Sequence, residues 1–172
     1  MKKYILSVLV EDRSGVLARV SLLFSRRGFN IHSLAVGNTE IEGISRMTIV
    51  VTGDEDIVEQ VIKQVSKLIE VIRVEVLNGE NSVGRELVMI KVSCKTDERS
   101  KIIEIVDIFR AKIIDVSQDS LTVEITGTEE KINALTEMLK PFKISEIVRT
   151  GLIALERGSK NINLDTDERK RY

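Results

Sequence analysis

The apolar residues in the first half of the chain alternate between the spacing of a strand and that of a helix. Residues 4–10 are apolar on both alternating faces, which is typical of a strand in the middle of a covered sheet. The spacing then becomes helical, and one stripe is formed by Val16, Leu17, Val20, Leu23 and Phe24. Gly28 follows this stripe and predicts the end of the helix, because glycine is favoured just past a helix C-terminus.

A predicted hairpin, a second helix and a fourth strand follow. Residues 30–39 and 44–52 are strand-like and flank a turn at 40–43. The apolar stripe of a second amphipathic helix runs through residues 57–68, and residues 71–76 alternate as a strand. The order of these elements is βαββαβ, which is the ferredoxin-like arrangement.

The second half repeats this order without recognisable residue identity. Between the halves, residues 78–84 are polar and carry two glycines, which is the composition of a linker. The elements predicted beyond it are a strand at 87–94, a helix at 102–109, a hairpin formed by 113–116 and 121–126, a helix that begins at Thr128 and is closed by Pro141, and an extended segment at 144–155.

We therefore predict an α+β fold with two ferredoxin-like βαββαβ domains in tandem. The first domain is assigned to residues 1–78, a linker to 79–85 and the C-terminal ferredoxin-like domain to 86–158. From about Arg157 the chain becomes polar, and residues 159–172 are expected to form a frayed tail.

The composition is that of a globular chain with no obvious polyanionic partner. Of its 172 residues, 42% are hydrophobic and 31% are charged, which is enough apolar material for a core. The 26 Lys and Arg residues are balanced by 27 Asp and Glu residues, so there is no positive field to hold nucleic acid or an anionic membrane. The single cysteine, Cys94, fits a reducing compartment, and no apolar run reaches the ~20 residues of a membrane span. We therefore expect a cytoplasmic protein.

Side chains that could perform catalysis are few. His32 is the only histidine, so any nucleophile system would have to be built around it. The neighbouring Ser33 points to the opposite face of the same predicted strand, and Cys94 lies in the other half of the chain. A zinc site needs three or four ligands at recurring spacing, and no glycine-rich phosphate loop follows a predicted strand. The residues therefore predict neither a catalytic centre nor a metal site.

One loop, residues 12–17, has the features of a small-molecule site. It precedes the first predicted helix, and a helix N-terminus presents unpaired N–H groups that hold a carboxylate. Gly15 lets a ligand approach the backbone, Asp12 could accept from an ammonium group, and Asn30 at the start of the next strand could do both. Together these groups match a free amino acid. In the alternative interpretation, Asp12 or Ser14 merely caps the helix, and the residues alone leave both interpretations open.

Four segments of the chain resemble the small subunit of acetolactate synthase, also called acetohydroxyacid synthase. They are residues 6–20 continuing through 24–31, the segment Ser45-Arg46-Met47-Thr48-Ile49, residues 109–116 and residues 149–158. The resemblance extends from about Lys3 to Gly158. It implies that the first domain is an ACT domain that binds an amino-acid effector.

The same resemblance implies a regulatory role in the biosynthesis of valine, leucine and isoleucine. Members of that family carry no active site and associate with a large catalytic subunit. The cofactors of that subunit are thiamine diphosphate, Mg and FAD, so this chain would need no cofactor of its own. The small subunits raise the activity of the catalytic subunit and confer feedback inhibition, usually by valine.

The resemblance also implies where the effector binds, namely at the meeting point of two ACT domains in a homodimer. The matching residues are Asp12, Ser14, Gly15, Val16, Leu17, Asn30 and Ile31. Many family members have Asn in place of Asp12, so the extra charge leaves the identity and affinity of the effector open. Two other classes remain open as well: a free-standing amino-acid-sensing module that acts on another enzyme or a transporter, and a small enzyme that uses His32.

Overall fold

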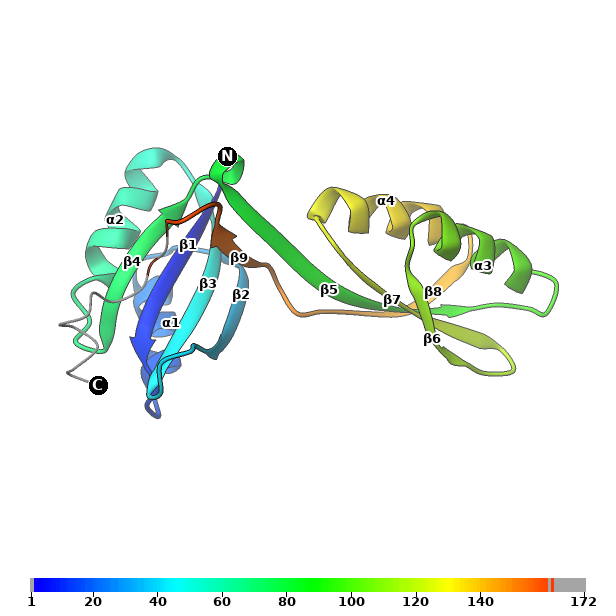
Figure 1. The fold of residues 1–172 in the computed structure, drawn as a ribbon, viewed down its shortest axis with the longest axis horizontal. Coiled ribbons are helices and arrows are strands. Elements are labelled where there is room, and N and C mark those ends of the chain that lie inside the picture. Colours follow the sequence, from blue (N-terminus) through cyan, green and yellow to red (C-terminus); the bar gives the residue numbers. More distant parts are fainter. Residues whose placement is uncertain (1, 161, 163–172) are drawn as a thin grey trace. The chain divides into compact units, whose positions relative to one another are not determined.

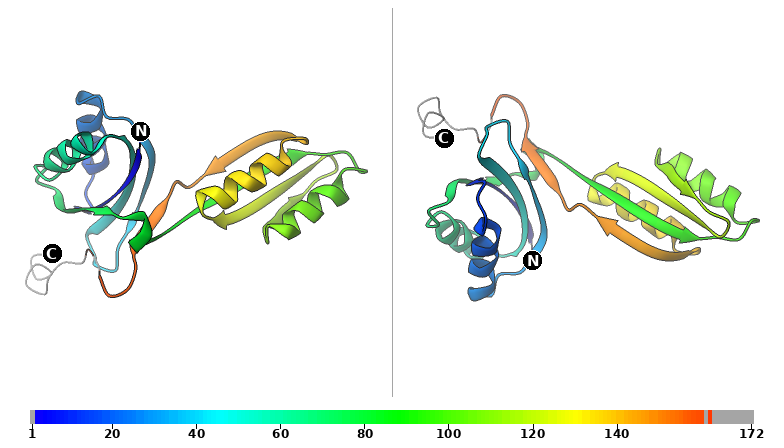
Figure 2. Two further views of the ribbon diagram at one scale, coloured as in Figure 1. Left: turned by 90° about the horizontal axis from the view of Figure 1, so that it is seen from above. Right: turned by 90° about the horizontal axis from the view of Figure 1, so that it is seen from below.

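The structure is a computed structural model that describes residues 2–160 and residue 162. The chain divides into two compact units, one formed by the residues up to Gly84 together with those from Leu152 onward, the other by Arg85–Gly151. Each unit contains an antiparallel sheet with two helices on one face (Figure 1; Figure 2). The prediction of an α+β fold with two ferredoxin-like βαββαβ domains is confirmed.

The first unit begins with the predicted order of elements. They are β1 (Lys2–Glu11), α1 (Val16–Arg26), β2 (Ile31–Asn38), β3 (Ile44–Gly53), α2 (Glu55–Val65) and β4 (Val71–Leu77). The strands pair in the order β2-β3-β1-β4, so β2 and β4 are the edges of this sheet. Asp54 is the N-cap residue of α2, and acidic residues in its first turn favour the helix electrostatically.

The core of the first unit lies between α1, α2 and one face of the sheet. It contains Leu6, Val8 and Val10 of β1 and Val16, Val20 and Phe24 of α1. Burying a side chain of this size contributes about 1.5–3 kcal/mol relative to leaving it in water. Leu17, which the sequence placed on the same stripe, is instead 44% exposed because it lies at the edge of the stripe.

The second unit repeats the arrangement. Its elements are β5 (Ser82–Ser93, whose first residues belong to the first unit), α3 (Arg99–Ile108), β6 (Lys112–Val116), β7 (Ser120–Gly127), α4 (Glu129–Leu139) and β8 (Lys143–Arg149). The strands pair in the order β6-β7-β5-β8. Thr128 caps α4, because its Oγ1 accepts a hydrogen bond from the N–H of Lys131 at 3.5 Å. The core residues include Val88, Ile90 and Val92 of β5 and Ile132, Leu135 and Leu139 of α4.

The segment expected to be a linker has regular structure. Oδ1 of Asn78 accepts a hydrogen bond from the N–H of Glu80 at 3.4 Å, and this cap starts a short 3-10 helix, η1 (Gly79–Asn81). β5 then begins at Ser82. The polar composition thus reflects a capped turn that leads directly into a strand.

The extended segment predicted at 144–155 is split. β8 ends at Arg149, and Gly151 then adopts a φ of 81°, a left-handed conformation that interrupts a strand and that glycine tolerates best. After this break β9 (Ile153–Glu156) pairs with β5 and belongs to the first unit, although the sequence grouped it with the second domain. Of the expected polar tail, residue 161 and residues 163–172 lie outside the described residues, and Ile162 is buried against Leu9 and Ile44.

Candidate functional site

The loop of residues 12–17 connects β1 to α1 and is held by backbone hydrogen bonds. The N–H of Asp12 donates to the carbonyl oxygen of Gly43 at 2.7 Å, and the N–H of Arg13 donates to that of Glu11 at 3.0 Å. These bonds fix the backbone, whereas the side chains of Asp12, Arg13 and Ser14 are exposed. The loop therefore offers a positioned backbone with accessible polar groups.

Gly15 is the N-cap residue of α1 and has a φ of 85°. This left-handed conformation disfavours residues with a side chain. Space is not the constraint, because a Cβ built at Gly15 would meet only Nη2 of Arg19, at an ordinary contact distance of 3.8 Å. The glycine is thus explained by the backbone turn into α1, and it leaves the approach to the helix N-terminus open.

The N-terminus of α1 carries no side-chain cap. Within the described part of the chain, no side chain accepts a capping hydrogen bond from its first N–H groups, so neither Asp12 nor Ser14 plays the role that the helix-cap interpretation gave it. Helix N-termini without such a partner retain unsatisfied donors and the positive end of the helix dipole. A carboxylate could satisfy these donors.

The two arginines beside the loop, Arg13 and Arg19, are already paired with carboxylates. Nη1 of Arg19 lies 2.8 Å from Oε1 of Glu70, and Nε of Arg13 lies 3.3 Å from Oε2 of Glu11. The N–H of Glu11 also donates to the carbonyl oxygen of Glu70 at 2.9 Å, which ties the end of β1 to the segment before β4. A ligand carboxylate at this site would consequently rely on backbone N–H groups.

Asn30 and Ile31 do not meet the 12–17 loop within one chain. Ile31 pairs with Val51, and Val51 pairs with Tyr4 near the beginning of β1, whereas the loop follows the end of β1 at Glu11. Tyr4 and Glu11 are seven positions apart, which corresponds to roughly 23 Å in a strand. The two parts of the predicted site therefore lie at opposite ends of the same sheet.

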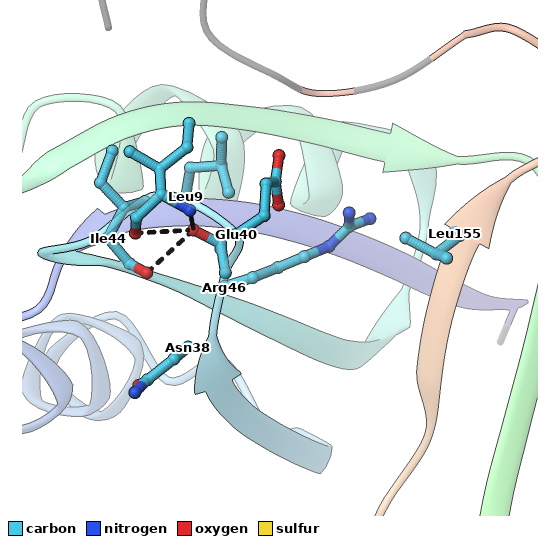
Figure 3. A pocket seen from close by; sticks show the side chains of 8 residues that line it. Leu9, Asn38, Glu40, Ile44, Arg46 and Leu155 are labelled. Carbon is cyan, nitrogen blue, oxygen red and sulfur yellow. Dashed lines mark hydrogen bonds between the residues drawn. The ribbon is translucent and has the colours of Figure 1, made fainter.

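A second candidate site, which the sequence did not predict, is a cavity on the sheet face opposite the helices. A cavity of about 240 Å³ opens there beside Arg46 of β3 and Glu40 of the β2–β3 turn (Figure 3). Burial lowers the pKa of Arg46, and the charges of Glu75, Glu40 and Glu156 oppose this shift. The sequence feature that could have indicated this site is Arg46, a charged residue in the largely apolar and β-branched strand β3.

The described residues give little support to catalysis or metal binding. His32 is exposed beside a register shift in β2, and Cys94 is buried. No group of three or more His, Cys, Asp or Glu side chains suited to a metal ion occurs among the residues that the structure describes. None of the helices in the described ranges is long and apolar enough to cross a membrane.

Both units match family models. Residues 6–73 match the model described as "AHAS small subunit-like ACT domain", which places the chain in the class of ACT-domain proteins. Residues 85–158 match the model described as "Small subunit of acetolactate synthase". Together the two matches cover most of both units.

Proteins similar to this chain in sequence or structure belong to the same family. The "Acetolactate synthase small subunit" of Mycobacterium bovis is 55% identical over 161 residues, which cover 94% of this chain and 96% of the relative. The "Probable acetolactate synthase small subunit" of Archaeoglobus fulgidus is 52% identical, over 92% of this chain and 99% of the relative. The crystal structure of the acetolactate synthase small subunit from Thermotoga maritima is 41% identical, with a TM-score of 0.87, over 93% of this chain and 100% of that one. The chain belongs to the acetolactate synthase small-subunit family, which confirms the resemblance drawn from its sequence.

Proposed function

We propose that this chain is the regulatory subunit of an acetolactate synthase in branched-chain amino-acid biosynthesis. It activates the large catalytic subunit, which holds thiamine diphosphate, Mg and FAD, and it confers feedback inhibition by valine or a related amino acid. The observation that carries this proposal is the uncapped N-terminus of α1 behind the left-handed Gly15, in a chain of the small-subunit family.

The 12–17 loop binds the polar end of the effector. The carboxylate lies at the N-terminus of α1, where backbone N–H groups and the helix dipole stabilise it. Asp12 is exposed and accepts from the ammonium group. Leu17, exposed at the start of α1, contacts the apolar side chain of the effector.

The complete site requires a second copy of the chain. Asn30 and Ile31 lie at the end of the sheet opposite the loop, but β2 is an edge strand, and exposed edges favour pairing with another strand. The other end of β2, at Asn38, lies on the loop side of the sheet, because Asn38 pairs with Ser45 and Ser45 pairs with Val10. Antiparallel pairing of two β2 edges would bring Ile31 of one copy to the loop end of the other.

The effector then acts by shifting an equilibrium of the holoenzyme. A ligand changes activity at a distance only through its different affinity for two states of the assembly. Loss of effector binding should therefore leave activation in place while inhibition disappears.

The test is reconstitution of the holoenzyme with wild type, Gly15→Asp and Gly15→Ala chains. The carboxylate of Gly15→Asp would compete with the effector for the helix N-terminus, so we expect activation to persist and valine inhibition to be lost. Gly15→Ala imposes the same backbone strain, about 1 kcal/mol, without the charge, and should retain inhibition in large part. A folded Gly15→Asp subunit that remains as sensitive as wild type would place the effector site elsewhere.

A further inference from the structure

The C-terminal part of the described chain covers the sheet face of the first unit that the helices leave open. The N–H of Leu152 donates to Oγ of Ser33 at 3.0 Å, and Nη2 of Arg46 donates to the carbonyl oxygen of Ala154 at 3.0 Å. Figure 1 shows β9 on the side of this sheet away from α1 and α2. This covering segment is defined as residues 152–160 and 162, and it is packed against the sheet at Ala154 and Ile162, which are 5% and 2% exposed.

The cavity of about 240 Å³ lies where the covering segment meets the β2–β3 hairpin. Its apolar walls are Leu9, Ile41, Ile44 and Leu155, and its polar wall includes Glu40 and Arg46. In Figure 3 the side chains of Glu40 and Arg46 extend toward the same space, with Leu155 beyond them. Leu155 is 59% exposed, so solvent reaches this wall of the cavity, whereas Leu9 and Ile44 are only 3% and 1% exposed.

One N–H group of Arg46, a residue that lines this cavity, has no hydrogen-bond acceptor in the part of the chain that the structure describes. Its Nη2 is engaged by Ala154, which fixes the direction of the guanidinium group, but its Nε is buried and has no acceptor among the described residues. Buried donors are nearly always paired in folded proteins, because an unpaired one keeps its full desolvation cost. An acceptor from outside the described chain would remove this cost.

We propose that this cavity is a second amino-acid site, distinct from the 12–17 loop, that takes a small apolar α-amino acid in its zwitterionic form. The ligand carboxylate accepts from Nε of Arg46, and the ligand ammonium donates to Glu40. The aliphatic side chain lies against Ile41 and Leu155, next to the buried Leu9 and Ile44.

The charges around Arg46 select this class of ligand. Glu40, Glu75 and Glu156 all lie close enough to act on the guanidinium charge, so a ligand with only a carboxylate would be repelled. A simple amine would leave Nε of Arg46 without an acceptor. A zwitterion answers both requirements, and a cavity of about 240 Å³ suits a small ligand.

The experiment uses the full chain with labelled Ile and Leu methyl groups and the Gly15→Asp substitution, which removes the loop site. L-leucine is titrated and methyl shifts are followed by NMR, with the corresponding 2-oxo acid and 3-methylbutylamine as comparison ligands. We expect saturable shifts of Leu9, Ile41, Ile44 and Leu155 with L-leucine alone. Because the shifts are assigned to individual residues, the result does not depend on whether the loop is the regulatory site.

Two variants and one control assign the polar contacts. Arg46→Met and Glu40→Gln should each weaken leucine binding at these methyl groups by at least about tenfold, since each removes a charged hydrogen-bond partner. Glu42→Gln removes a neighbouring exposed carboxylate that does not line the cavity, and it should bind as wild type. Glu40→Gln keeps the test valid if Arg46→Met loosens the covering segment, a change that thermal melting would reveal.

Three results would overturn the proposal. The first is the absence of saturable shifts at these four residues at millimolar leucine. The second is unchanged affinity in Glu40→Gln, and the third is equal binding of the 2-oxo acid. Each would mean that Arg46 has no zwitterionic ligand.

Discussion

Nη2 of Arg46 donates a hydrogen bond to the carbonyl oxygen of Ala154 at 3.0 Å, across 108 positions of the sequence. The bond joins β3 to β9 on the face of the sheet that α1 and α2 do not cover. Close by, the N–H of Arg157 donates to the carbonyl oxygen of Asn81 at 2.7 Å. The first unit is thus completed by a segment that the chain reaches only after it has formed the second unit.

The substitution Ala154→Asp should destabilise the first unit by about 3 kcal/mol, because it places an unpaired charge at a position that is 5% exposed. Ile153→Asp is the matched control, since Ile153 is the adjacent residue but is 58% exposed, and it should change stability by no more than about 0.5 kcal/mol. Hydrogen exchange resolved by element would show faster exchange in β1 and β3 of Ala154→Asp, with β7 unchanged. Equal effects of the two substitutions would argue against burial of β9 on this sheet.

Ser7→Ala should stabilise the first unit by about 1 kcal/mol. Ser7 is fully buried in β1, and its hydroxyl has no hydrogen-bond partner among the described residues. Removing such a hydroxyl removes its desolvation cost without losing a bond. Urea denaturation of the full chain measures the change as a shift of the first-unit transition to higher denaturant.

Ser45→Ala provides the opposite case for this measurement. Ser45 is also buried, but its Oγ donates to Oδ1 of Asn38 at 3.4 Å. This variant should be destabilised by up to about 1 kcal/mol. Destabilisation of both variants would indicate that the hydroxyl of Ser7 has an acceptor outside the described residues.

Much of the fold could be predicted because each element carries its own periodicity. The change from the alternating pattern of β1 to the stripe of α1 is local, and it placed the start of α1 at the observed Val16. The β-branched residues of β3 and the capping Thr128 before α4 are local signals as well. Elements whose conformation is determined by their local sequence were therefore predictable in type and order.

The location of β9 could not be predicted, because its local pattern is that of any strand. Ile153 and Leu155 alternate with Ala154 in a way that is compatible with either sheet. The choice between the sheets depends on Ser33 and Arg46, which are more than a hundred residues away in the sequence. The Arg46 cavity escaped prediction for the same reason, since β9 supplies one of its walls.

The candidate effector site was predictable only in part. A polar loop with a glycine before a helical stripe marks a helix N-terminus, so the sequence placed Asp12 and Gly15 correctly between β1 and α1. It could not show that Asn30 lies far from them, because that follows from the reversal of the chain through α1 and from the strand register.

The chain in solution should be a homodimer whose mass by light scattering is twice that of one chain. The physical reason is the exposed edge of β2, which pairing with a second β2 would satisfy. Dilution should lower the measured mass toward that of the monomer, since association follows mass action. A concentration-independent monomer at micromolar concentration would contradict both the dimer and the two-copy effector site.

Mixed dimers that contain one Gly15→Asp chain and one Asn30→Ala chain should regain inhibition that neither variant shows alone. If the 12–17 loop of one copy works with Asn30 of the other, then each homodimer of a variant has two defective sites. The mixed dimer concentrates both defects in one site and leaves the second site intact. Asn30 is exposed, so its truncation should cost little stability.

The mixed dimer is purified through two different affinity tags, combined with the catalytic subunit and assayed with valine. We expect about half of the wild-type sites to function, seen as partial inhibition at saturating valine. Should each site instead be formed within one chain, both sites of the mixed dimer would be defective, and inhibition would be absent as in the homodimers.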